Sequence, residues 1–161
     1  MPTVRKTISD LPQIASGEIN PDDPAHRAPQ HTPRILKRIG KTPIDGGDRR
    51  DIALADQIEA HKNIDLRGSR GFTDVYGRLR RYKPAVNITA KSSTPSCGRF
   101  LHPDQDLNIS VREAAILQGF PQTYVLKGPF VNQYRQIGEA VPPLFTRFLA
   151  FQVLDHLSIA T

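Results

Sequence analysis

Hydrophobic residues recur at helical spacing most clearly in the last third of the chain. Ser110 and Glu113 stand three positions apart, directly before an apolar run. This spacing predicts a capping box, in which the serine oxygen accepts from the Glu113 amide and the Glu113 side chain accepts from the serine amide. We therefore expect a helix over residues 111–118, which Gly119 and the Phe-Pro pair after it bring to an end.

A second helix is expected at Pro142-Pro143, because proline lacks an amide hydrogen that the first helical turn leaves unbonded anyway. Its body is apolar on nearly every side, through Leu144, Phe145, Phe148, Leu149, Phe151, Val153, Leu154 and Leu157. Such a helix is normally buried. The other elements look too few and too polar to cover it. We expect it to pack on a partner chain, on a domain absent from this sequence, or on a second copy.

Two shorter helices are expected earlier in the chain. Thr32 and Pro33 are typical of an N-cap and a first helical position, and Gly40 is typical of the end of that helix. Apolar residues at helical spacing predict another helix from Asp51 to Lys62.

The remaining pattern favours strands and connectors. Six prolines within residues 1–33 indicate an extended connector, in which only residues 3–8 favour a short strand or a helical turn. Residues 72–80 and 86–89 are β-rich and predict two adjacent, antiparallel strands. The expected fold class is α+β, with short antiparallel strands and loops followed by C-terminal helices.

Charge divides the chain in the same way. The 161 residues carry 22 Lys and Arg against 16 Asp and Glu, a net charge of +6. The balance is +7 over residues 1–100 and −1 over residues 101–161. A basic region beside a neutral, apolar one favours nucleic acid as partner, with a generic basic adaptor or a solvated surface as alternatives. A single cysteine excludes an internal disulfide, and no apolar run is long enough to span a membrane, so we expect a cytoplasmic protein without a membrane partner.

Catalytic and metal-binding patterns are scarce. The sequence has no P-loop, no dinucleotide fingerprint and no zinc spacing, and it predicts no catalytic residue and no metal ligand. His61, His102 and Cys97 each lack a companion that favours chemistry, so structural or surface roles are expected for them. Basic residues alternate with aromatic ones over residues 67–83, and Arg49-Arg50 add a second basic pair. These positions favour DNA contact.

Three segments together resemble one known family. They are GRFLHPDQDLNISVREAAILQGFP at 98–121, QIGEAVPP at 136–143 and FTDVYGRLRRYKPAVNITAK at 72–91. In this order they resemble the C-terminal part of bacterial DNA (cytosine-5) methyltransferases: the ninth motif, the tenth motif and the target recognition domain, respectively.

The resemblance implies a two-domain enzyme whose Rossmann-like α/β domain binds S-adenosylmethionine and carries the catalytic cysteine in a Pro-Cys-Gln loop. The single cysteine, Cys97, follows a serine and not a proline, so this sequence contains no Pro-Cys-Gln. The catalytic loop is therefore expected on a separate catalytic chain. Residues 1–109 resemble the DNA-reading region, and residues 110–161 resemble the helices that complete the catalytic domain. The implied cofactor-facing residues are Gly138, Glu139, Ala140 and Val141. The expected contacts to duplex DNA are Arg49, Arg50, Arg78, Arg80, Asn87, Thr89 and Arg99.

The chain also departs from the family pattern. Glu139 stands where the tenth motif usually has Asn, and Asn87 stands where the recognition segment usually has Thr. A carboxylate at 139 could repel the carboxylate of the donor. Two hypotheses therefore remain: the C-terminal subunit of a split bacterial methyltransferase, and a non-catalytic DNA-binding remnant of a prophage or restriction–modification enzyme.

Overall fold

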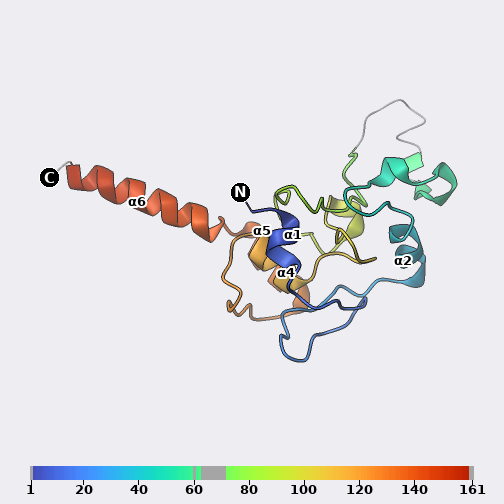
Figure 1. The fold of residues 1–161 in the computed structure, drawn as a ribbon, viewed down its shortest axis with the longest axis horizontal. Helices are drawn as coiled ribbons and strands as arrows, with labels where there is room; N and C mark the ends of the chain where they lie inside the picture. The colour runs from blue at the N-terminus through green and yellow to red at the C-terminus, as the bar shows by residue number, and fades with distance from the viewer. Residues whose placement is uncertain (1, 60, 63–71, 160–161) are drawn as a thin grey trace.

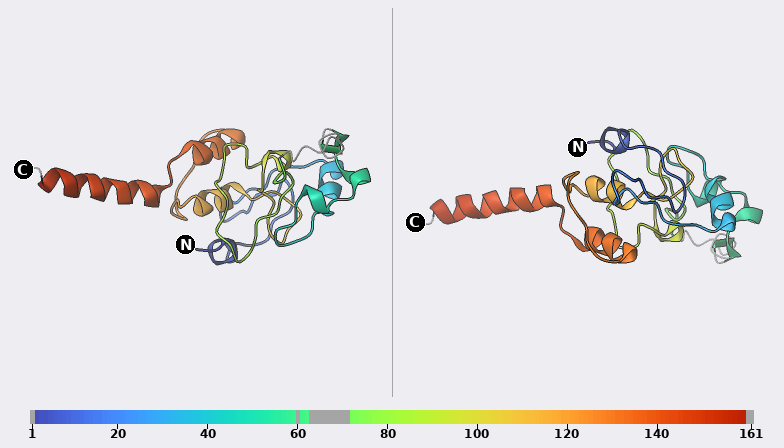
Figure 2. Two further views of the ribbon diagram at one scale, coloured as in Figure 1. Left: turned by 90° about the horizontal axis from the view of Figure 1, so that it is seen from above. Right: turned by 90° about the horizontal axis from the view of Figure 1, so that it is seen from below.

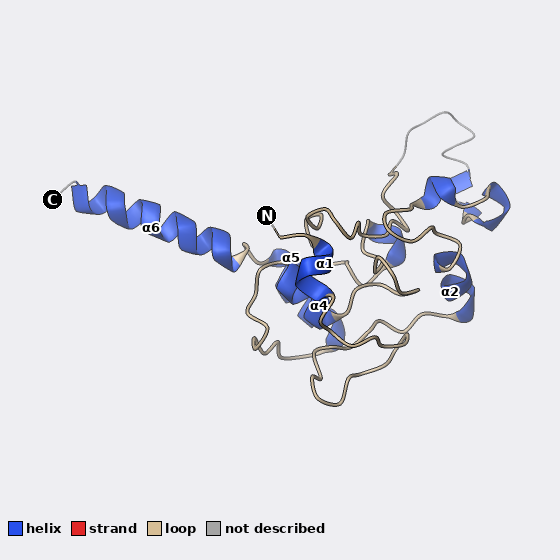
Figure 3. Cartoon of the chain, in the orientation of Figure 1, coloured by secondary structure: helices blue, strands red, loops and turns tan. Residues whose placement is uncertain are grey.

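The computed structural model describes residues 2–59, 61–62 and 72–159 of the chain. Figure 1 shows a body of short helices and long loops from which one helix projects. The α-helices are α1 (Val4–Ile8), α2 (Pro33–Ile39), α4 (Val111–Leu117), α5 (Phe130–Glu139) and α6 (Pro143–Ile159). Single 3₁₀ turns occur at Arg49–Asp51, Leu54–Asp56 and Pro95–Cys97. Figure 3 shows that loops make the connections.

Helix α4 forms as its capping box predicts. The Glu113 amide donates to Ser110 Oγ at 3.1 Å, and the Ser110 amide donates to a Glu113 carboxylate oxygen at 2.6 Å. Helix α2 is also confirmed, with Thr32 as its N-cap and Gly40 as its C-cap. Residues 3–8 take the helical alternative, because Thr3 caps α1. The amides of Val4 and Arg5 then donate to the backbone of residues 81–83.

The main core brings distant parts of the chain together. Its buried members come from α1, the loops of residues 79–109, α4, the loop before α5, and α5: Val4, Ile8, Leu79, Ile88, Phe100, Ile109, Val111, Ala114, Ala115, Leu126, Tyr134 and Ile137. Tyr134 donates its hydroxyl to the carbonyl of Ile109 at 2.7 Å. This core therefore includes residues on both sides of position 109, and a domain boundary there stays a prediction.

The expected α+β fold is wrong for the part of the chain that the structure describes, because no strand forms there. Backbone pairing is limited to three isolated bridges, two of them at Leu101, with Arg78 and with Asn108. Around Arg78, the pairing of residues 72–80 stops after one residue. On one side Tyr76 has a φ of +54°, in the left-handed region. On the other side the chain turns, with the Lys83 amide donating to the Arg80 carbonyl.

The second expected strand, at residues 86–89, forms no bridge either. Ile88 is buried in the main core, while the neighbouring Asn87 is exposed. The chain turns immediately afterwards, as the Ser92 amide donates to the Thr89 carbonyl at 3.0 Å. The alternation of polar and apolar residues here therefore belongs to a loop, which the side chain of Ile88 fixes to the main core.

The helix expected from Asp51 to Lys62 is also replaced over its first half. Residues 49–56 form two 3₁₀ turns. The Gln57 side-chain amide donates to the carbonyls of Arg49 and Ile52 at 3.1 and 3.0 Å. These carbonyls are thereby satisfied without a continuous helix. Residues 59, 61 and 62 are helical.

Helix α5 was not predicted from the sequence, whereas α6 was. Helix α6 extends away from the body in all views (Figures 1 and 2). Its apolar side chains are between 44% and 69% exposed, from Leu149 to Leu144. No described residue of the chain therefore covers α6, and its packing on a partner chain, an absent domain or a second copy stays a prediction.

Candidate functional site

Arg78 lies in the interior, with 1% of its surface exposed. Its Nε donates to the Thr42 carbonyl at 2.9 Å. Its terminal nitrogens donate to further carbonyls and to the Asp106 carboxylate. Those carbonyls belong to Ile39, His102 and Gln105. All five N–H groups of the guanidinium are therefore used. Arg78 joins the end of α2 to the loop of residues 102–106 and presents no donor to a ligand.

Arg99 has a similar role beside it. Its Nε and Nη2 donate to Asp74 at 3.1 and 3.0 Å, and Nη2 also donates to Asp48 at 3.0 Å. Its Nη1 donates to the carbonyls of Gly46 and Arg78 at 2.7 and 2.9 Å. Arg99 thus holds the turn at residues 46–48 against the segment that contains Arg78.

Arg49 is the third buried arginine among the expected DNA contacts, and it is 1% exposed. Its Nε donates to the Phe72 carbonyl at 2.9 Å. The Phe72 side chain itself is 84% exposed. Arg49 therefore positions the backbone of an exposed aromatic residue.

Arg50, Arg80 and Asn87 lie at the surface, and Thr89 is half-buried. The Arg50 guanidinium donates twice to the Asp48 carboxylate, at 2.7 and 2.9 Å. Burial favours a raised pKa for Asp48, but hydrogen bonds from Arg50 and Arg99 lower it to about 2. Asp48 thereby couples a buried arginine to an exposed one.

Thr89 lines an open groove of about 590 Å³. The other lining residues are Phe72, Asp74, Val75, Ala90, Lys91, Ser96, Cys97 and Gly98. The Cys97 thiol is free, and Cys97 is exposed. The groove places the expected recognition residue Thr89 beside an exposed aromatic ring and a lysine.

The segment expected to face the cofactor contacts the loop of residues 89–90 directly. A Cβ on Gly138 would lie 2.0 Å from the Ala90 nitrogen and 2.1 Å from the Thr89 carbonyl carbon. Only glycine permits this approach of α5 to the loop. The structure therefore brings Gly138 and Thr89 together, although they stand far apart in the sequence.

The three residues that follow Gly138 make contacts of other kinds. The Glu139 carboxylate lies 3.4 Å from Arg135 Nε in an exposed ion pair along α5. The Ala140 carbonyl accepts from the Gln118 side chain at 3.2 Å, and Val141 is 58% exposed. The Gln118 hydrogen bond ties the end of α5 to α4, and Ala140 is half-buried.

His102 and Glu113, in the segment that resembles the ninth motif, belong to a buried polar network. His102 Nδ1 accepts from the amides of Asp104 and Gln105 at 3.1 and 3.0 Å, and its Nε2 lies 3.5 Å from the Glu113 carboxylate. Burial lowers the pKa of His102, while Glu113 opposes that effect. The structural role expected for His102 is thus observed.

Sequence reasoning missed two residues that complete this network. His26 is fully buried, and its ring nitrogens lie 2.9 Å from Ser110 Oγ and 2.8 Å from the Pro12 carbonyl oxygen. Asp23 forms a two-bond ion pair with Arg112, whose hydrogen bond lowers the pKa of Asp23. Both stand in the proline-rich connector, where no periodicity indicates a buried side chain.

Two further searches cover only the described residues. No three His, Cys, Asp or Glu side chains among residues 2–59, 61–62 and 72–159 gather closely enough to hold a metal ion. Within the same ranges, no helix has the length and apolar character needed to cross a bilayer.

Comparison with known proteins identifies the family. The model of the C-5 cytosine-specific DNA methylase family matches residues 7–155. The chain is 36% identical to the type II methylase M.HgiDII of Herpetosiphon aurantiacus over 159 residues, which covers 96% of this chain and 44% of that protein. It is 40% identical to the type II methyltransferase M.AgeI of Thalassovita gelatinovora over 101 residues, 63% of this chain and 23% of that protein.

A plant protein is also similar. DNA (cytosine-5)-methyltransferase 3 of Arabidopsis thaliana is 35% identical over 164 residues, which covers 88% of this chain and 12% of that protein. The chain therefore belongs to the C-5 cytosine-specific DNA methylase family, whose members transfer a methyl group from S-adenosylmethionine to DNA. It spans less than half the length of these curated relatives.

Proposed function

We propose that this chain supplies target recognition and part of the S-adenosylmethionine pocket for methyl transfer to cytosine C5 in duplex DNA. It acts together with a catalytic chain that carries the earlier motifs of the family. The observation that carries the proposal is the contact of Gly138 with Thr89 and Ala90. It joins the segment that resembles the cofactor-facing tenth motif to the segment that resembles the recognition domain.

The surface chemistry supports duplex DNA as substrate. Arg50 and Arg80 present exposed guanidinium groups, which suit phosphates and guanine edges, and Asn87 presents an amide. Arg49, Arg78 and Arg99 are buried and donate hydrogen bonds to backbone carbonyls of the neighbouring loops. We propose that they position the DNA contacts instead of making them.

The reaction needs groups that this sequence does not show. A thiolate must add to cytosine C6 and leave again once a base has removed the C5 proton from the methylated ring. S-adenosylmethionine would supply the methyl group from its sulfonium, which would leave as a neutral thioether. Cys97 stands in Ser-Cys-Gly, not in Pro-Cys-Gln. The nucleophile therefore belongs to the catalytic chain, and the backbone of residues 138–141 contributes one wall of the donor pocket. The bacterial cytoplasm is the matching location for both chains.

Helix α6 provides the matching docking element. Its exposed apolar side chains, from Leu144 to Leu157, have no cover in the described parts of this chain. Burying them against the catalytic chain is favourable at roughly 25 cal/mol per Å² of apolar surface.

The alternative is a DNA-binding remnant without catalysis. Glu139 and Asn87 favour it, since both replace residues typical of the family. The Arg135 partner of Glu139 favours the enzyme instead, because the ion pair draws the carboxylate along α5.

A reconstitution assay tests the proposal. The full chain is mixed with a family catalytic chain that ends before the recognition region, labelled S-adenosylmethionine and duplexes of varied sequence. We expect label in cytosine only when both chains are present. No transfer at any ratio, with duplex binding retained, would identify the remnant.

A further inference from the structure

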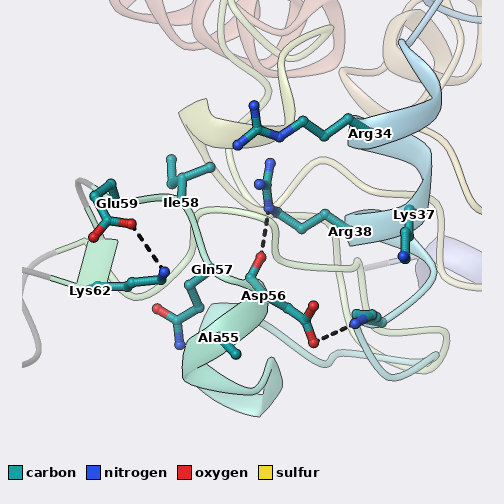
Figure 4. Close-up of a pocket in the computed structure, with 10 residues that line it drawn as sticks. Arg34, Lys37, Arg38, Ala55, Asp56, Gln57, Ile58, Glu59 and Lys62 are labelled. Carbon is teal, nitrogen blue, oxygen red and sulfur yellow. Dashed lines mark hydrogen bonds and ion pairs between the residues drawn. The ribbon is translucent and has the colours of Figure 1, made fainter.

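A basic pocket lies between α2 and a segment that contributes residues 55–59 and Lys62, outside the expected DNA and cofactor contacts (Figure 4). It holds about 290 Å³. Its lining is mostly charged: Arg34, Lys37, Arg38, Lys41, Ala55, Asp56, Gln57, Ile58, Glu59 and Lys62. Figure 4 shows Arg34 and Arg38 extending from α2 toward the same space, one above the other.

The two carboxylates of the pocket already have partners. Asp56 pairs with Lys41, and Glu59 pairs with Lys62 at 3.0 Å. The hydrogen bond from Lys41 lowers the pKa of Asp56 and so keeps its carboxylate charged. Arg34, Lys37 and Arg38 form no ion pair within the residues that the structure describes. The pocket thus carries three positive charges beyond those that its two carboxylates neutralise.

Arg38 is built into the pocket wall. It is 9% exposed, its Nε donates to the Asp56 carbonyl at 3.0 Å, and its Nη1 donates to the Tyr76 hydroxyl at 3.2 Å. Its guanidinium carbon lies 5.4 Å from the centre of the Tyr76 ring. Its Nη2 makes no hydrogen bond in the described part of the chain. A fixed guanidinium with an unused amino group is preorganised for an oxyanion.

Two like charges directed into one space repel each other unless an anion lies between them. The shape of the pocket restricts that anion. Among the lining residues that the structure describes, Ala55 and Ile58 are apolar and none is aromatic. With no aromatic ring for a nucleobase and with guanidinium groups that pair with oxyanions, the pocket fits a single phosphate group better than a nucleotide.

We propose that this pocket binds a backbone phosphate of duplex DNA, through Arg34, Lys37 and Arg38, outside the bases that are read. The inference rests on the proposed function. Continuity with the expected DNA surface supports it, because Gln57 lines the pocket and its side chain donates to the carbonyl of Arg49, the residue before Arg50. A duplex held at Arg50 can thus continue across α2.

Salt-dependent binding of a labelled duplex to the full chain tests the inference. The variants are Arg34→Gln and Lys37→Gln, whose exposed side chains form no ion pair in the described ranges, so folding is retained and circular dichroism verifies it. Each lost phosphate contact reduces the slope of log affinity against log salt by about 0.9. We expect a reduction of about that size, equal on all duplex sequences, for either variant.

Lys127→Gln is the matched control, because Lys127 is exposed in the loop before α5. It should keep the wild-type slope. If Arg34→Gln and Lys37→Gln also keep that slope while the wild-type chain binds DNA, the pocket inference is overturned and the proposed function stands. A wild-type chain that binds no duplex overturns both.

Discussion

Arg78 and Arg80 stand two positions apart in the sequence and have opposite surroundings. Arg78 uses all five donors on the protein interior, whereas Arg80 is exposed beside Gly46. Sequence alone favours both as DNA contacts, because an arginine in a basic run is usually solvated. The buried carbonyls that Arg78 satisfies come from residues distant in the sequence, so no local pattern reveals its role.

Substituting these two arginines separates stability from DNA affinity. Arg78→Gln leaves buried carbonyls without donors and should lower the free energy of unfolding by about 3 kcal/mol. Arg80→Gln should change stability by less than about 0.5 kcal/mol and weaken duplex binding. Urea unfolding and anisotropy of a labelled duplex measure the two effects. Equal stability of both variants would contradict the structural role of Arg78.

Two histidines, the buried His102 and the half-buried His31, should make stability depend on pH. Burial lowers the pKa of both His102 and His31 below the ordinary value of 6.5. Between the folded and unfolded pKa values the unfolded chain binds more protons, so acid favours unfolding. The free energy of unfolding should therefore fall as the pH drops below about 6.5. Urea midpoints at about pH 7.5 and about pH 5.5 measure this. His102→Gln should show a shallower dependence, and equal wild-type midpoints would refute the prediction.

At the scale of elements, the caps were predictable and the strands were not. The box at Ser110 and Glu113 and the Thr32–Pro33 start are local signals, and α4 and α2 form where these signals stand. The strand pattern failed at Tyr76, whose positive φ turns the chain. Position 76 holds a residue type typical of strands, so its conformation depends on tertiary contacts.

The cap of α4 should matter more than the cap of α2. Ser110 Oγ accepts from the Glu113 amide and also contacts buried His26. Ser110→Ala should therefore cost about 2 kcal/mol, the sum of a cap and a buried hydrogen bond. Thr32→Ala removes an exposed cap with a 3.4 Å hydrogen bond and should cost at most about 1 kcal/mol. Urea unfolding of both variants gives the comparison, and a larger loss for Thr32→Ala would contradict it.

The contact of α5 with the loop of residues 89–90 gives a second test at this scale. Gly138→Ala places a methyl group against the backbone of residues 89–90, which must move, and should cost about 3 kcal/mol or more. Gly128→Ala is the control, because its added Cβ meets nothing within 4 Å and costs only the strain of a φ of +92°, about 1 kcal/mol. Thermal unfolding should show a larger loss of stability for Gly138→Ala than for Gly128→Ala. A larger loss for Gly128→Ala would contradict the close packing at Gly138.

At the scale of the whole molecule, α6 should govern association. Helix α6 exposes apolar side chains along its length, so we expect self-association of the chain in solution. Phe148→Glu with Leu154→Glu should yield a monomer with unchanged stability, since both side chains are more than half exposed. Sedimentation velocity distinguishes the two states. A wild-type chain that is monomeric at all concentrations would contradict the expectation.

Burial of Arg49, Arg78 and Arg99 divides the expected DNA contacts into a buried set and an exposed set. The buried set donates hydrogen bonds to carbonyls and carboxylates of the fold, so we expect a substitution there to disturb the surrounding loops. Arg50, Arg80 and Asn87 are exposed, although Arg50 also donates twice to Asp48. Under the proposed function, we expect a library varied at these three positions to yield new target preferences while the buried arginines keep the framework unchanged.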